Sequence, residues 1–181
     1  MFRCINIISL ITLSFWLIGC AGLGNMKVVE FQTQSKPDMA TVNIVRRAVF
    51  YGDGVKVEAW DGEKFIGTLG PGELLQYQAE PGMHTFLASM KHSWAVAQGE
   101  LEAGKTYYLK FNMSGWSAVN LGVAKPTDPR IPEWNRMTTI IIDESDPKPV
   151  AQKYISRAQR ILKKVEDGTA IITPITDANA M

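Results

Sequence analysis

The sequence has little of what common functional sites depend on. Its only cysteines are Cys4 and Cys20, near the start, so the rest of the chain cannot form an internal disulfide or a cysteine-ligated metal site. Lysine and arginine number 19 against 18 acidic residues, which excludes the basic excess typical of nucleic-acid binding. No Gly-x-Ser-x-Gly elbow or glycine-rich phosphate loop is present. The composition is that of one ordinary globular domain and establishes no biochemical activity.

The first nineteen residues follow the plan of a secretory signal. Arg3 comes early, and an apolar stretch over residues 5–18 follows it. The stretch is too short for a transmembrane helix, which needs about 20 apolar residues. It ends in Leu17-Ile18-Gly19-Cys20, which resembles a bacterial lipobox. The resemblance implies that the Cys20 thiol receives a diacylglyceryl group and that the signal peptide is cleaved before it.

We therefore predict a lipoprotein that is anchored to a membrane through Cys20 without spanning it. Two or three acyl chains, such as palmitate, give a stable anchor where one gives only marginal binding. Ala21 follows the cysteine; in Gram-negative lipoproteins a residue other than Asp at this place usually implies the periplasmic face of the outer membrane. In a host with a single membrane the anchor would stay on its outer face. Residues 20–39 predict a lipidated tether with a short edge strand at 28–31.

The middle of the chain has the pattern of an antiparallel β-sandwich. Apolar residues recur at every second position, and turn residues interrupt them about every 8 to 12 positions. Val55, Val57 and Ala59 therefore fall on one face of a strand, which we assign to the core. We expect strands at 41–47, 55–60, 64–69, 74–79, 84–90, 94–101 and 106–113.

The second half adds strands and one helix to this pattern. Strand-like runs at 117–125 and 136–142 flank a proline-rich loop and predict a hairpin extension, which completes a sandwich domain over 40–145. Residues 146–168 predict a strongly amphipathic helix packed on or beside the sandwich. A short strand at Ile171-Ile172 and a frayed tail end the chain, within a predicted C-terminal tail over 169–181. The predicted fold class is mainly β, an antiparallel sandwich with a C-terminal amphipathic helix.

Three segments carry a family likeness within the predicted sandwich. They are Asp61-Gly62-Glu63-Lys64-Phe65-Ile66-Gly67, Pro81-Gly82-Met83-His84-Thr85-Phe86 and Leu101-Glu102-Ala103-Gly104-Lys105-Thr106-Tyr107-Tyr108. In this order they resemble bacterial lipoproteins that carry a small β-sandwich domain of unknown function, PEGA-like in appearance. The resemblance implies a sandwich in the cell envelope and supplies no catalytic residues. We accordingly assign no catalytic residue, cofactor or metal ligand.

The two histidines are the candidates for chemistry. His84 shares a predicted strand face with Phe86, Ala88 and Met90, which favours a packed neutral histidine with one hydrogen-bonded nitrogen. On one continuous strand, His92 would lie roughly 27 Å from it, too far to share a metal ion. A small envelope hydrolase that uses His84 or His92 is the alternative function.

Two groups of charged residues flank and cover the predicted helix. An acidic cluster of Asp143, Glu144 and Asp146 precedes it, and favourable charge at the helix N-terminus explains this cluster better than a calcium or acid–base site. The polar side of the helix is basic, as a solvated face commonly is. Among the aromatic residues, which are more often core residues, Trp60 is the best placed for exposure because it falls opposite Val55, Val57 and Ala59. The candidate ligand or partner surface combines this residue with the basic side of the helix: Trp60, Lys153, Arg157, Arg160 and Lys164.

These observations favour a non-catalytic, lipid-anchored module that binds or scaffolds an envelope component. The predicted partners are the membrane, through the lipid on Cys20, and an envelope protein or a cell-wall polymer; nucleic acid is excluded. The second alternative is a peripheral module that docks to a membrane or a partner through the helix over 150–165. An apolar helix side open to solvent would support that alternative.

Overall fold

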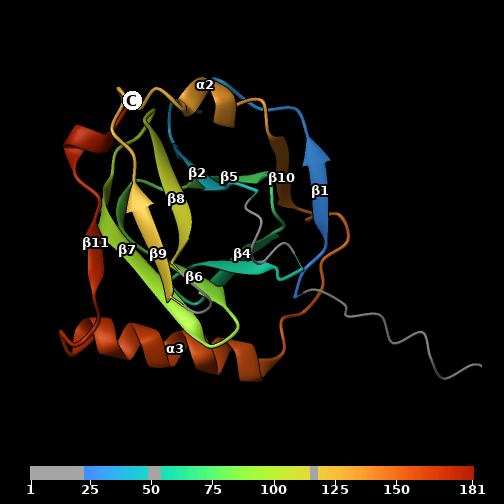
Figure 1. The fold of residues 1–181 in the computed structure, drawn as a ribbon, viewed down its shortest axis with the longest axis vertical. Helices are drawn as coiled ribbons and strands as arrows, with labels where there is room; N and C mark the ends of the chain where they lie inside the picture. Colours follow the sequence, from blue (N-terminus) through green and yellow to red (C-terminus); the bar gives the residue numbers. More distant parts are fainter. Residues whose placement is uncertain (1–22, 49–53, 115–117) are drawn as a thin grey trace, which may run out of the picture.

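The computed structural model describes residues 23–48, 54–114 and 118–181. In these ranges the chain is mainly β, with two facing sheets and one long helix near the C-terminus (Figure 1). The predicted β-sandwich with a C-terminal amphipathic helix is therefore confirmed. The elements are β1 (Met26–Val29), β2 (Ala40–Arg46), β3 (Val57–Asp61), β4 (Lys64–Leu69), β5 (Glu73–Ala79), β6 (Gly82–Met90), β7 (Ser93–Leu101), β8 (Thr106–Ser114), β9 (Ala118–Val123), α2 (Ile131–Trp134), β10 (Thr138–Ile142), α3 (Gln152–Glu166), β11 (Ile172–Pro174) and the 3-10 helix η2 (Asp177–Asn179).

The strands form a six-stranded sheet in the order β1-β10-β5-β2-β8-β9 and a five-stranded sheet in the order β11-β7-β6-β3-β4. Most neighbours are antiparallel, as predicted, but β2 with β8, β5 with β10, and β7 with β11 run parallel. Both sheets are therefore mixed. The strands β9 and β10 lie apart in the first sheet, so the predicted hairpin extension is wrong.

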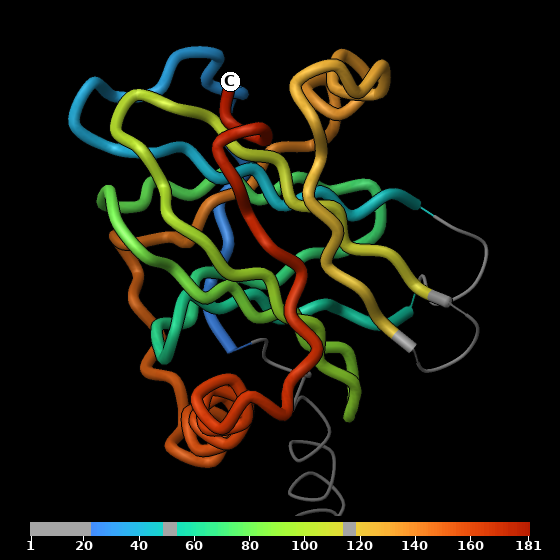
Figure 2. The backbone as a smooth tube through the Cα atoms, turned by 90° about the vertical axis from the view of Figure 1, so that its left-hand side faces the viewer, coloured from blue at the N-terminus to red at the C-terminus, as the bar shows by residue number. Residues whose placement is uncertain are grey.

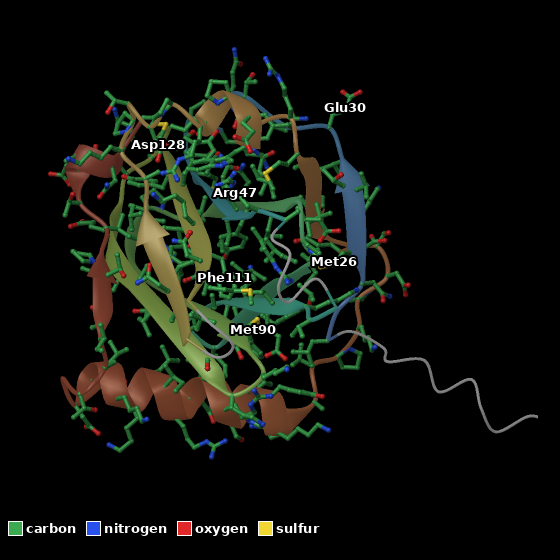
Figure 3. All side chains as sticks on the ribbon, in the orientation of Figure 1. Met26, Glu30, Arg47, Met90, Phe111 and Asp128 are labelled. Carbon is green, nitrogen blue, oxygen red and sulfur yellow. The ribbon has the colours of Figure 1, made fainter. Side chains whose placement is uncertain are left out.

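The main core lies between the two sheets and follows the predicted alternation. Val57 and Ala59 of β3 are fully buried there, as are Tyr107 and Leu109 of β8. Met90 and Phe111 also lie in this core (Figure 3). Each sheet also carries apolar residues on its outer face, away from this core. Both outer faces therefore need cover from other parts of the chain, because exposed apolar surface raises the free energy of the folded state.

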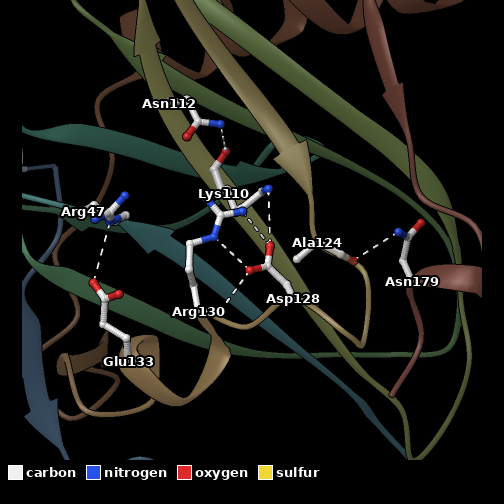
Figure 4. A network of polar contacts seen from close by, with 8 residues as sticks. All are labelled: Arg47, Lys110, Asn112, Ala124, Asp128, Arg130, Glu133 and Asn179. Carbon is white, nitrogen blue, oxygen red and sulfur yellow. Dashed lines mark hydrogen bonds and ion pairs between the residues drawn. The ribbon is translucent and has the colours of Figure 1, made fainter.

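The proline-rich loop covers the outer face of the six-stranded sheet. It ends in α2, where Trp134 is fully buried and its ring lies 6.0 Å from that of Tyr108. Asp128 holds the loop in shape because it accepts two hydrogen bonds from the Arg130 guanidinium, at 2.8 and 2.7 Å, and pairs with Lys110 at 3.6 Å (Figure 4). The hydrogen bonds from Arg130 lower the pKa of Asp128 to about 2. The loop and α2 thus shield the outer face of the six-stranded sheet from water.

Helix α3 covers the outer face of the five-stranded sheet. Ala158 of α3 packs in a buried cluster with Trp60, Phe65 and Leu87 of that sheet. The Trp60 side chain is 0% exposed and its ring meets that of Phe65 edge-on at 5.2 Å. Trp60 is therefore wrong as part of the candidate partner surface, because alternation identifies the outer face but does not show that a helix buries it.

Both ends of the described chain lie against the sandwich. β1 pairs with β10, and the Gln76 side chain bonds both backbone groups of Gln32, at 3.0 and 2.9 Å. The predicted tether is therefore wrong for residues 23–39, while residues 20–22 lie outside the described ranges. The C-terminal segment runs from α3 along the sandwich to its other end (Figure 2). There Asn179 donates to the Ala124 carbonyl at 3.1 Å, so the predicted frayed tail is also wrong.

We predict that Ala158→Glu lowers the free energy of unfolding by about 3 kcal/mol or more, because it places a carboxylate in the apolar layer beneath α3. Lys164→Glu, on the exposed side of the same helix, should change this free energy by no more than about 0.5 kcal/mol. Urea unfolding followed by tryptophan fluorescence measures both variants. Equal stability of the two variants would contradict the packing of α3.

Candidate functional site

A groove opens where β10 separates from β5. Within the described ranges, β10 pairs residues 73–75 of β5 and then continues beside β1, so residues 76–79 have no strand neighbour on that side. A groove of about 620 Å³ lies at this gap, between β4 of one sheet and β5 and β10 of the other. Its size is within the range of small-molecule binding sites, roughly 300 to 1,000 Å³.

The groove combines an apolar floor with a basic rim. Phe65, Ile66 and Ile142 contribute to the floor. The rim carries four lysines against two acidic residues, an excess of two positive charges: Lys27, Lys36, Lys64 and Lys148 against Asp143 and Glu144. Such a lining complements a ligand with an apolar body and an anionic group, because the floor removes apolar surface from water while ammonium groups attract the anion.

A polar cluster lies behind one wall of the groove. The Tyr77 side chain lines the groove, and its hydroxyl donates to Asp61 Oδ2 at 3.1 Å. Asp61 also accepts a hydrogen bond from His84 Nδ1 at 2.9 Å. The other ring nitrogen of His84, Nε2, lies 2.8 Å from the Glu80 carbonyl oxygen. Asp61 thus joins β3, β5 and β6 at this end of the sandwich.

The surroundings of His84 favour its charged form. Both ring nitrogens face acceptors, and only the imidazolium donates from both. The hydrogen bond to Asp61 raises the pKa of His84, while burial opposes this shift. The predicted strand face is confirmed, since the ring stacks on Phe86 at 5.7 Å. These contacts favour the charged form over the predicted neutral one, and the sequence does not show that Asp61 lies opposite His84.

This arrangement is unsuited to nucleophilic catalysis at His84. A general base must accept the proton of a nucleophile through a free nitrogen. Nδ1 of His84 bonds Asp61 and Nε2 bonds the Glu80 carbonyl. His92 lies exposed in the turn after β6, at the other end of that strand. In the part of the chain that the structure describes, no group of three His, Cys, Asp or Glu side chains is placed to hold a metal ion.

The acidic cluster has a role other than the predicted one. Helix α3 begins at Gln152, after the two prolines that follow the cluster, so the carboxylates do not sit at its N-terminus. Asp143 instead accepts hydrogen bonds from the backbone and side chain of Ser145, at 3.1 and 2.6 Å. Asp146 accepts one from Asn25 at 2.7 Å. These carboxylates shape the loop at the edge of the groove and tie it to the segment before β1.

The predicted basic surface lies on the outer side of α3. Lys153, Arg160 and Lys164 are exposed, as predicted for this side. Arg157 is half-buried, because its guanidinium donates to the Lys91 carbonyl at 2.7 Å and lies 5.6 Å above the Trp94 ring. Arg157 thus fastens α3 to the turn between β6 and β7. Cys20, the predicted lipidation site, lies outside the described ranges.

Sequence reasoning missed the groove. Its lysines come from four separate segments, and its floor forms only because β10 leaves β5 partway along that strand. At this point in β5 the apolar pair Leu74-Leu75 gives way to alternating polar and apolar residues, but this change does not show which strand lies beside it. Strand pairing between distant segments, which no local pattern contains, determines the groove.

The fold and the groove define a mainly-β sandwich with a concave binding surface at an open strand edge. Comparisons of this chain with family models, with curated proteins and with solved structures found no match. No helix within residues 23–48, 54–114 and 118–181 has both the length and the apolar character needed to cross a membrane.

We predict that stability decreases as the pH rises above about 6.5. Because the folded state raises the pKa of His84 above its ordinary value of 6.5, its stabilising contribution is fully present below that pH. The contribution is lost as the pH rises through the folded pKa, by about 1 to 2 kcal/mol in all. Urea unfolding over this range should show the decrease in the wild type and in His92→Gln, and a flatter profile in His84→Gln. Identical profiles for all three proteins would contradict a charged His84.

Proposed function

We propose that this protein is a lipid-anchored cell-envelope lipoprotein whose β-sandwich acts as a non-catalytic binding module. The groove beside β5 carries the binding part of this proposal, and the run Leu17-Ile18-Gly19-Cys20 carries the anchor. Ala21 supports placement on the periplasmic face of the outer membrane. The resemblance to lipoproteins with a small sandwich domain of unknown function agrees with each part and supplies no ligand.

The residues that line the groove indicate which chemical groups its ligand carries. An anionic group fits the lysine rim, and an apolar part of the same ligand fits the floor at Phe65, Ile66 and Ile142. A segment of an envelope protein or an envelope polymer could present both features. Binding without catalysis is supported by the position of His84, whose two nitrogens already bond Asp61 and Glu80.

The two alternative functions have weaker support. A hydrolase that uses His84 would need a nitrogen free to accept a proton. A module that docks through the apolar side of the helix would need that side open, whereas in α3 it packs on Trp60, Phe65 and Leu87. The exposed basic side of α3 is a different surface.

The anchor predicts a simple difference between the two cysteine variants. Cys20→Ser should take up no labelled palmitate in growing cells, because the thioether to the lipid cannot form, and it should keep the mass of the uncleaved chain. Cys4→Ser is the matched control, since Cys4 would leave with the signal peptide, and its labelling and mass should equal those of the wild type. If Cys20→Ser took up palmitate as the wild type does, the anchor at Cys20 would be refuted.

The groove can be tested with 1-anilinonaphthalene-8-sulfonate, which has an aromatic body and one negative charge. The wild type should bind it with a rise in fluorescence. Reversing two rim charges, in Lys27→Glu/Lys64→Glu, should weaken binding about tenfold or more. Lys125→Glu, exposed and outside the groove lining, is the matched control and should bind as the wild type does. Equal weakening in the control would contradict binding at the groove.

A further inference from the structure

The predicted lipid site lies three residues before Leu23, a residue that packs against the cluster beneath α3. Only Ala21 and Gly22 separate Cys20 from Leu23, the first described residue. Three residues span at most about 10 Å when extended. Leu23 packs against the cluster that Trp60, Phe65 and α3 form. Figures 1 and 2 both place the start of the described chain beside α3. Acyl chains on Cys20 would therefore hold this side of the sandwich next to the bilayer.

Charge is concentrated on the same side. Helix α3 contains five basic residues and one acidic residue, Glu166. The chain from Cys20 onward contains 18 basic and 18 acidic residues, so the part outside α3 has thirteen basic against seventeen acidic. A mature protein without net charge thus has a helix with an excess of four positive charges. This excess lies on the element nearest the predicted anchor.

The basic residues of α3 are placed to meet a surface. Lys153, Arg160 and Lys164 are exposed, while the apolar side of the helix is occupied by the five-stranded sheet. Lys91, in the turn that Arg157 fastens to α3, is exposed and extends the basic area. Acidic groups also lie nearby. Asp167 pairs with Lys163 at 3.3 Å, Glu63 bonds Gln159 at 3.1 Å, Glu58 interacts with the charge of Arg157, and Glu166 ends the helix.

We propose that the exposed basic side of α3 lies on the anionic headgroups of the membrane that holds the Cys20 lipid. The inference rests on the proposed anchor and adds an orientation to it: α3 towards the bilayer and α2 away from it. A lipid anchor keeps the helix at high effective concentration near the headgroups, so a weak attraction is sufficient to orient the domain. The contact is electrostatic and does not insert the helix, since its apolar side is already buried.

The proposed orientation also determines where the groove lies relative to the membrane. Phe65 and Ile142 belong both to the groove lining and to the cluster beneath α3. One wall of the groove therefore lies on the membrane-proximal sheet, and the opposite wall lies on the six-stranded sheet. A ligand held at the membrane surface, or carried by another envelope component there, would reach it without the domain leaving the bilayer.

The test uses full-length lipidated protein in vesicles and one added thiol. Cys4 leaves with the signal and Cys20 is blocked by lipid, so Arg160→Cys on α3 and Arg136→Cys beyond α2 each provide a unique labelling site; both positions are exposed. A fluorophore at each site is measured against a quencher attached to lipid headgroups. In vesicles of phosphatidylcholine with phosphatidylglycerol, we expect about fivefold stronger quenching at position 160 than at 136.

Charge dependence separates this contact from simple tethering. The excess quenching at position 160 should disappear in Lys153→Glu/Lys164→Glu, in phosphatidylcholine alone, and at 1 M salt, where the Debye length is about 3 Å. Equal quenching at 160 and 136 would overturn the orientation and leave the anchor intact. Excess quenching that persists without anionic lipid would refute the electrostatic contact. Protein that does not remain with the vesicles would refute the anchor, and the orientation with it.

Discussion

The structure depends on one constraint: both sheets carry apolar residues on their outer as well as their inner faces. A sandwich alone would leave these outer faces in water. The chain covers them with Trp134 of α2 on one side and with the apolar side of α3 on the other. Once α3 is used in this way, its basic side has to face outwards. The surface chemistry of the molecule thus follows from the way its second sheet is buried.

The sequence predicted what local pattern can specify. Alternation gave the inner face of β3 correctly, and the strands expected at 55–60 and 64–69 correspond to the paired strands β3 and β4. It could not show that Trp60 lies under a helix, that β10 separates from β5, or that Asn179 binds the Ala124 carbonyl. Each of these depends on a contact between residues far apart in the chain. For the same reason, the candidate groove was beyond prediction while the basic side of the helix was not.

The polar cluster at Asp61 and the groove are parts of one arrangement. Asp61 holds the Tyr77 hydroxyl and His84 together, and Tyr77 lines the groove. The cluster thus fixes one wall of a concave surface whose floor is apolar and whose rim is basic. The cluster holds side chains in place, because both ring nitrogens of His84 already have partners inside the protein. These contacts agree with the proposed binding module.

The proposed orientation requires that α3 is an integral layer of the sandwich. Hydrogen–deuterium exchange of the mature protein tests this directly. If α3 packs on Trp60 and Phe65, its backbone amides should exchange at the slow rate of β3 and β6, through global unfolding. Rapid exchange throughout α3 while β3 and β6 stay protected would show a detached helix, and it would contradict both the layered packing and the orientation that depends on it.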